Sequence, residues 1–139
     1  MFLSTFIISG LDYRYKWSTV PLLVVLISAV MVLTGYILFF IVMRQNSYAS
    51  RVVEIQEKQK VIDTGLYGIV RHPMYSAAIL MFMSMPLVLG SYYALIPLVI
   101  FPYQMGTRMR NEEQILEKGL EGYIDYKKRV RYKIIPFIW

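Results

Sequence analysis

A run of 24 residues without a charged side chain constrains this chain more than any other feature. It covers residues 20–43 and reads VPLLVVLISAVMVLTGYILFFIVM. A helix rises about 1.5 Å per residue, so this run is long enough to cross roughly 30 Å of hydrocarbon. It follows a charged patch and lacks the small-residue cleavage site of a signal peptide. We therefore predict a retained transmembrane helix over about 19–43.

The composition agrees with a chain that is partly dissolved in lipid. Of 139 residues, 57% are hydrophobic and 17% are charged, which is more apolar surface than one small domain can bury. The absence of cysteine excludes disulfides, thiolate metal sites and a cysteine nucleophile. A single histidine argues against a multi-histidine metal site, so we expect no metal.

A second apolar region begins at Met74 and is broken in its middle by the sequence GSYY. Each half is short for an upright span, and its prolines are expected to bend or unwind the helices. The pattern predicts a tight helical hairpin with spans of about 74–90 and 92–106. We expect an all-α integral membrane protein with about three transmembrane helices, one long span plus this hairpin, in a single domain over 1–139.

The positive charge is distributed as in a membrane protein rather than a nucleic-acid-binding protein. If the hairpin returns the chain to its starting side, residues 44–73 and 107–139 share one side of the membrane. They carry 5 and 8 of the 15 Lys and Arg residues, and the remaining two, Arg14 and Lys16, lie across the membrane. Cytoplasmic segments are the ones enriched in Lys and Arg. We therefore expect both segments to be cytoplasmic and expect no nucleic acid as a partner.

Polar residues gather in the loop before the hairpin and in the tail after it. Because both segments adjoin the same hairpin, we expect their side chains to meet at the lipid surface, where the loop and a helix in the tail form a pocket. Taken singly, each residue has an ordinary interpretation, such as Arg71 as a snorkelling anchor or His72 as a helix start before proline. The residues expected to meet are Tyr67, Arg71, His72, Tyr75, Arg108, Arg110, Glu112 and Glu113.

Four motifs then resemble a known family. They read GLYGIVRHPMY from Gly65, RMRNEEQIL from Arg108, GYIDYKKRV from Gly122 and IPFI from Ile135. Together they are similar to the isoprenylcysteine carboxyl methyltransferases and the related phospholipid methyltransferases, over residues of about 44–139. These are integral membrane enzymes that use S-adenosylmethionine as a cofactor.

The resemblance implies a cofactor site, with a looser match at Gln56. It also implies that Arg108 binds the methyl acceptor and that His72 takes part in catalysis. Tyrosine faces suit adenine and the sulfonium, Glu112 suits an ammonium or ribose hydroxyls, and His72 suits the cofactor's carboxylate or adenine edge. The implied cofactor-binding residues are Gln59, Lys60, Val61, Ile62, Tyr67, His72, Pro73, Met74, Tyr75 and Glu112.

The implied function is methyl transfer to a lipid-like or hydrophobic acceptor at the cytoplasmic membrane face. Displacement at a reactive methyl donor depends on alignment and on exclusion of water, so no nucleophilic triad is required. A carboxylate acceptor is favoured, because it is nucleophilic at neutral pH and needs only a cation such as Arg108. An amine would first have to lose a proton to His72 or Glu113.

Departures from the family pattern keep alternatives open. The first 43 residues match only as an apolar span, so the chain is truncated or completes its bundle with a second copy or a partner that supplies helices. The segment GLEG replaces the family's Phe-Gly with a spacing one residue shorter, which leaves open whether Glu112 or Glu113 faces the cofactor. A noncatalytic partner subunit is one alternative. A nicotinamide-dependent membrane reductase is another, although its cofactor phosphates call for more arginines than Arg44, Arg51 and Arg71.

Overall fold

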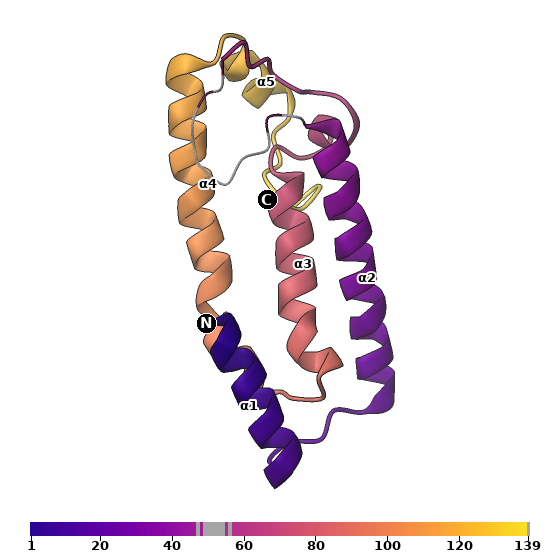
Figure 1. The fold of residues 1–139 in the computed structure, drawn as a ribbon. Helices are drawn as coiled ribbons and strands as arrows, with labels where there is room; N and C mark the ends of the chain where they lie inside the picture. Colours follow the sequence, from indigo (N-terminus) through magenta and orange to yellow (C-terminus); the bar gives the residue numbers. More distant parts are fainter. Residues whose placement is uncertain (47, 49–54, 56, 139) are drawn as a thin grey trace. The chain divides into compact units, whose positions relative to one another are not determined.

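The computed structural model describes residues 1–46, 48, 55 and 57–138. Over this part of the chain the fold is all-α, as predicted (Figure 1). Gln56, Arg51 and Trp139 lie outside the described residues. The chain forms two compact units, Met1–Ile37 with Ala77–Gln104 and Leu38–Ser76 with Met105–Trp139. The helices are α1 (Phe2–Tyr15), α2 (Leu22–Gln45), α3 (Pro73–Val88), α4 (Ile100–Gly119) and α5 (Tyr123–Arg129), with two 3₁₀ helices, η1 (Gly65–Gly68) and η2 (Tyr93–Leu98).

Helix α2 is the predicted long span. It contains 24 residues, and within the described residues it is the one helix long and apolar enough to cross a membrane. Only 11% of its most apolar stretch is buried within the protein, whereas a core helix of a soluble protein buries most of its surface. Helix α3 is a shorter apolar helix of 16 residues.

The hairpin breaks where the sequence predicts, but its second arm differs from the prediction. Helix α3 ends at Val88, and Gly90 takes a left-handed backbone conformation with φ of 76°. The predicted arm over 92–106 is not one helix, because η2, which contains Pro97, precedes α4. Helix α4 then continues to Gly119, since residues 107–118 contain no glycine or proline to stop it.

The first unit turns polar side chains of α1 inward. Thr5, Ser9 and Asp12 are buried, while the apolar Leu3 is 74% exposed. The Asp12 carboxylate accepts hydrogen bonds from the Ser18 backbone N–H at 2.7 Å and from the hydroxyls of Ser18 and Ser91. These bonds tie the segment after α1 to the segment before η2, and they satisfy a charge that would be costly to bury alone.

The apolar core of the second unit is formed mainly by residues between Leu116 and Val130. Leu120, Tyr123, Tyr126 and Val130 pack together there, and Leu116 packs against them. Two glycines separate the helices of the tail, because α4 ends at Gly119 and α5 begins after Gly122, whose φ is 81°. Helix and loop residues from both ends of this unit thus surround one core.

Candidate functional site

The backbone around His72 is fixed from two directions. Pro73 is the first residue of α3, a position that suits proline because its nitrogen needs no hydrogen-bond partner there. The carbonyl of His72 accepts hydrogen bonds from the N–H groups of Tyr75 and Ser76, each at 3.1 Å. From the tail, the carbonyls of Tyr132 and Lys133 accept the N–H groups of Arg71 and His72 at 2.9 and 2.8 Å.

A pocket in the second unit collects the residues expected to bind the cofactor. Every one of them except Pro73 lines it, and so does Arg108. Pro73 lies instead at the start of α3, and Arg110 is exposed, with its Nε donating to the Gly106 carbonyl at 3.4 Å. The lining residues are Asn46, Tyr48, Gln59, Lys60, Val61, Ile62, Tyr67, Arg71, His72, Met74, Tyr75, Arg108, Glu112, Ile115, Leu116, Leu120, Tyr123 and Tyr126.

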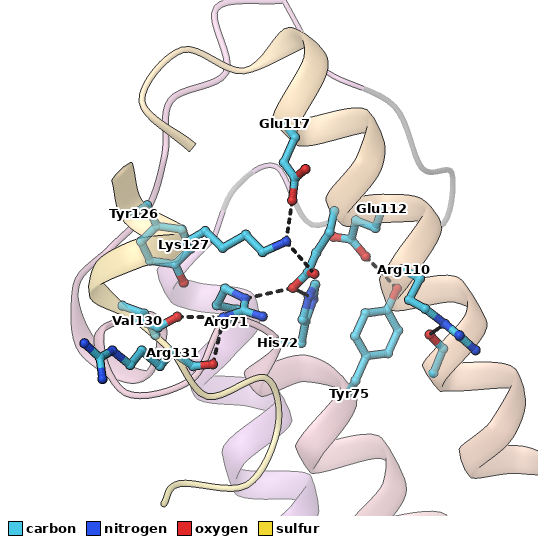
Figure 2. Close-up of polar contacts among 12 residues, drawn as sticks. Arg71, His72, Tyr75, Arg110, Glu112, Glu117, Tyr126, Lys127, Val130 and Arg131 are labelled. Carbon is cyan, nitrogen blue, oxygen red and sulfur yellow. Dashed lines mark hydrogen bonds and ion pairs between the residues drawn. The ribbon is translucent and has the colours of Figure 1, made fainter. Parts of the chain in front are cut away.

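Tyr75 connects the charged residues of the pocket. Its hydroxyl donates to Glu112 Oε2 at 2.8 Å and accepts from Arg108 Nε at 2.9 Å (Figure 2 shows Tyr75 beside Glu112). Arg108 and Glu112 are four residues apart on α4, so both side chains lie on one helix face. The arrangement places a cation and an anion side by side on the pocket wall.

The two neighbouring glutamates have separate environments. Glu112 lines the pocket, whereas Glu113 is 4% exposed and accepts from Arg71 Nε at 2.8 Å and from His72 Nε2 at 3.1 Å. Burial alone would raise the pKa of Glu113, but the hydrogen bonds from His72 and Arg71 outweigh it and lower this pKa to about 2. In the structure Glu112, not Glu113, is the residue on the pocket side.

Arg71 is a buried structural cation as well as a pocket residue. Besides its contact with Glu113, its Nη1 donates to the carbonyls of Val130 and Arg131, both at 2.8 Å (Figure 2). A snorkelling anchor keeps its charge in water, but Arg71 is only 7% exposed. That interpretation of Arg71 is therefore wrong for this structure.

Tyrosines form much of the remaining wall. The Tyr67 hydroxyl accepts from Asn46 Nδ2 at 2.8 Å, and the Tyr126 hydroxyl donates to the Tyr67 carbonyl at 2.8 Å. Burial raises the pKa values of Tyr67, Tyr123 and Tyr126, so all three phenols are neutral. Tyr123 and Tyr126 were not among the predicted site residues, although the motif GYIDYKKRV that contains them pointed to this segment.

The pocket thus offers neutral aromatic faces beside an Arg–Tyr–Glu contact and an imidazole. Within the described residues no group of three or more carboxylate or histidine side chains is placed to hold a metal. Tyrosine faces can take an aromatic base or a cation, and the pair of Arg108 and Glu112 can take a ligand with charges of both signs.

Comparison with known proteins decides the family. A profile of the phospholipid methyltransferase family matches residues 23–121 of the chain. The chain belongs to the phospholipid methyltransferase family. Members of this family are integral membrane enzymes that use S-adenosylmethionine as methyl donor, and they share a superfamily with the isoprenylcysteine carboxyl methyltransferases. The resemblance read from the motifs is confirmed.

A second likeness is to a protein named for a different activity. The Delta(14)-sterol reductase of Mus musculus is 29% identical over 84 residues. The aligned region makes up 58% of this chain and 20% of the reductase, so the chain spans about a fifth of that relative's length.

Proposed function

We propose that this member of the phospholipid methyltransferase family transfers a methyl group from S-adenosylmethionine to a lipid-like acceptor, with a carboxylate favoured, at the cytoplasmic membrane face. The observation that carries the proposal is the pocket. Residues from the loop, from the start of α3 and from α4 surround it, and nearly all of the residues implied to bind the cofactor are among them.

The residues present fit the chemistry of this cofactor. Faces of Tyr67 and Tyr75 suit the adenine or the sulfonium, each contact contributing roughly 0.5–2 kcal/mol. Glu112 suits the ammonium or the ribose hydroxyls, and His72 offers a ring nitrogen for a hydrogen bond. When bound, the cofactor supplies a methyl group activated by a positive sulfur. The chain's own task is to align the acceptor with that group and to exclude water.

Arg108 supports an anionic acceptor. Its guanidinium is held on the pocket wall by the hydroxyl of Tyr75, so its orientation is set before an acceptor binds. A carboxylate needs no base, and Arg108 would hold it as a charge-assisted hydrogen-bond donor. The apolar part of the acceptor would remain in the bilayer that α2 is suited to cross.

Binding of S-adenosylhomocysteine to the purified protein in nanodiscs tests the cofactor assignment. We expect wild-type protein to bind with a Kd on the order of micromolar. His72→Ala and Glu112→Ala should each lose affinity, and Arg110→Ala, which changes an exposed cation outside the pocket lining, should not. A well-folded wild-type protein that does not bind would contradict the proposal and favour a noncatalytic partner subunit. Transfer of labelled methyl groups to a lipid extract, fractionated by headgroup charge, then tests the acceptor.

The likeness to a sterol reductase favours one second candidate, a nicotinamide-dependent membrane reductase. Its cofactor carries phosphates that need arginines or lysines. Of the arginines that line the pocket, Arg71 already contacts Glu113 and two carbonyls, and Arg108 contacts Tyr75. Titration with NADPH under the same conditions separates the two candidates, because a reductase binds NADPH and is indifferent to S-adenosylhomocysteine.

A further inference from the structure

Glu113 is surrounded by cations although it does not line the pocket. Its Oε1 accepts from Arg71 and from His72, and Lys127 Nζ lies 3.4 Å from Oε2 (Figure 2 shows Arg71, His72 and Lys127 converging). Arg71 balances the charge of this carboxylate, and Lys127, which also pairs with Glu117, adds to that balance. A charged imidazole at His72 would add a further cation to a site that is almost closed to water.

The contact with Glu113 determines which ring nitrogen of His72 carries the proton. An ionised carboxylate has no proton to donate and can only accept hydrogen bonds. The nitrogen that faces it, Nε2, must therefore hold the hydrogen. In a neutral imidazole the other nitrogen, Nδ1, is then an acceptor. Within the described residues, the ring nitrogens of His72 have this one hydrogen bond, and the side chain of His72 lines the pocket.

We infer that Glu113 is a positioning residue that fixes His72 with its proton on Nε2, so that Nδ1 accepts a hydrogen bond from an N–H or O–H group of the bound ligand. The inference rests on the proposed function for the identity of that ligand. It assigns His72 to the adenine amine, the ammonium or a ribose hydroxyl of the cofactor. It excludes the cofactor's carboxylate at this nitrogen, because a carboxylate offers no proton.

Nitrogen NMR of the ligand-free protein tests the protonation state directly. His72 is the only histidine in the chain, so labelling with ¹⁵N-histidine gives one ring to observe without assignment. In mildly alkaline buffer, where a histidine side chain is ordinarily neutral, we expect a proton on Nε2 that is protected from exchange with water. A proton on Nδ1, or a ring proton in fast exchange in the wild-type protein, would overturn the inference.

Two substitutions separate positioning from general stability. Glu113→Gln keeps an oxygen that can accept from Nε2, so we expect the protected ring proton and S-adenosylhomocysteine affinity within about twofold of wild type. Glu113→Ala removes the acceptor and should lose both. Glu117→Gln, which changes the other carboxylate beside Lys127, is the matched control. If Glu113→Ala does not fold, the wild-type spectrum and the Glu113→Gln variant still test the inference. An Nε2 proton that stays protected from exchange in a folded Glu113→Ala variant would count against it.

Ligand analogues test what Nδ1 holds. His72→Ala should weaken S-adenosylhomocysteine binding by about 2- to 10-fold, the effect of one hydrogen bond. That factor should be unchanged for the decarboxylated analogue and should vanish for one analogue that lacks the donor, such as one with unsubstituted purine in place of adenine. A factor that vanishes only for the decarboxylated analogue would overturn the inference. Absence of any binding would count against the proposed function, while the NMR result on ligand-free protein would stand by itself.

Discussion

The guanidinium of Arg71 joins three segments of the second unit. It pairs with Glu113 on α4 and donates to the carbonyls of Val130 and Arg131 in the tail. Arg71→Met would leave Glu113 as a buried charge without this partner, and removing one member of a buried pair costs about 3–5 kcal/mol. We expect a marked fall in the thermal unfolding midpoint in detergent. Arg110→Met, at an exposed cation, should change stability by less than about 0.5 kcal/mol, and equal effects of the two substitutions would contradict this role for Arg71.

The pKa of Glu113 predicts an acid-sensitive contribution to stability. Its folded-state pKa of about 2 lies below the ordinary value of 4.5, so the folded state favours the ionised form. The stabilisation is therefore complete above about pH 4.5 and is lost as the pH falls from there toward 2. Lys127 stays charged in this window, because its hydrogen bond with Glu117 raises its pKa.

Unfolding midpoints measured across this window check the pH prediction. Glu113→Gln should be less stable than wild type at neutral pH, and its stability should fall less steeply between about pH 4.5 and 2. Glu117→Gln should keep the wild-type slope. Parallel curves for wild type and Glu113→Gln would show that Glu113 does not carry this contribution.

Among the elements, the backbone conformation at the start of the short helix η1 requires a glycine. Gly65 has φ of 59°, and an added Cβ would collide with the side-chain amide of Gln45. That amide is not free to move away without loss, since its oxygen accepts from the Leu66 N–H at 3.1 Å. Gly65→Ala should therefore cost about 1–2 kcal/mol from the left-handed backbone alone and should weaken ligand binding through Tyr67, which η1 carries.

Gly106→Ala is the matched control for this prediction. Gly106 lies inside α4, and an added Cβ there meets nothing within 4 Å. Because alanine is the better helix former, this substitution should stabilise the helix by up to about 1 kcal/mol. Thermal unfolding and S-adenosylhomocysteine binding measured on both variants make the test. If Gly65→Ala behaved like Gly106→Ala, the η1 turn would not depend on glycine.

The same elements show which parts of the structure could be predicted from sequence. A local signal, the sequence GSYY, located the break of the hairpin, and glycines also mark the interruption between Gly119 and Gly122. The separate environments of Glu112 and Glu113 could not be predicted, because adjacent residues on a helix differ only in which side they face. The contact that orients Glu113 comes from Arg71, 42 residues away. The attachment of the tail to Arg71 and His72 is likewise made by backbone groups, which leave no residue pattern.

At the scale of the whole molecule, apolar side chains cover much of the described surface. Leu3 on α1 and Leu22, Leu23 and Val30 on α2 are each more than 60% exposed. A water-soluble monomer rarely leaves so many large apolar side chains uncovered. Lipid is the solvent that suits these helices, in agreement with the membrane enzymes of the family.

Engineered cysteines test the orientation that the charges predict. The chain contains no cysteine, so each substitution introduces the only thiol. Lys128, whose side chain is 72% exposed, lies in the tail expected to be cytoplasmic, and Tyr15, 58% exposed, lies beside the two cations expected on the other side. In right-side-out vesicles an impermeant maleimide should label Tyr15→Cys at once but label Lys128→Cys only after permeabilisation. Labelling of Lys128→Cys in sealed vesicles would place the pocket-forming tail outside, where cytoplasmic S-adenosylmethionine would not reach it.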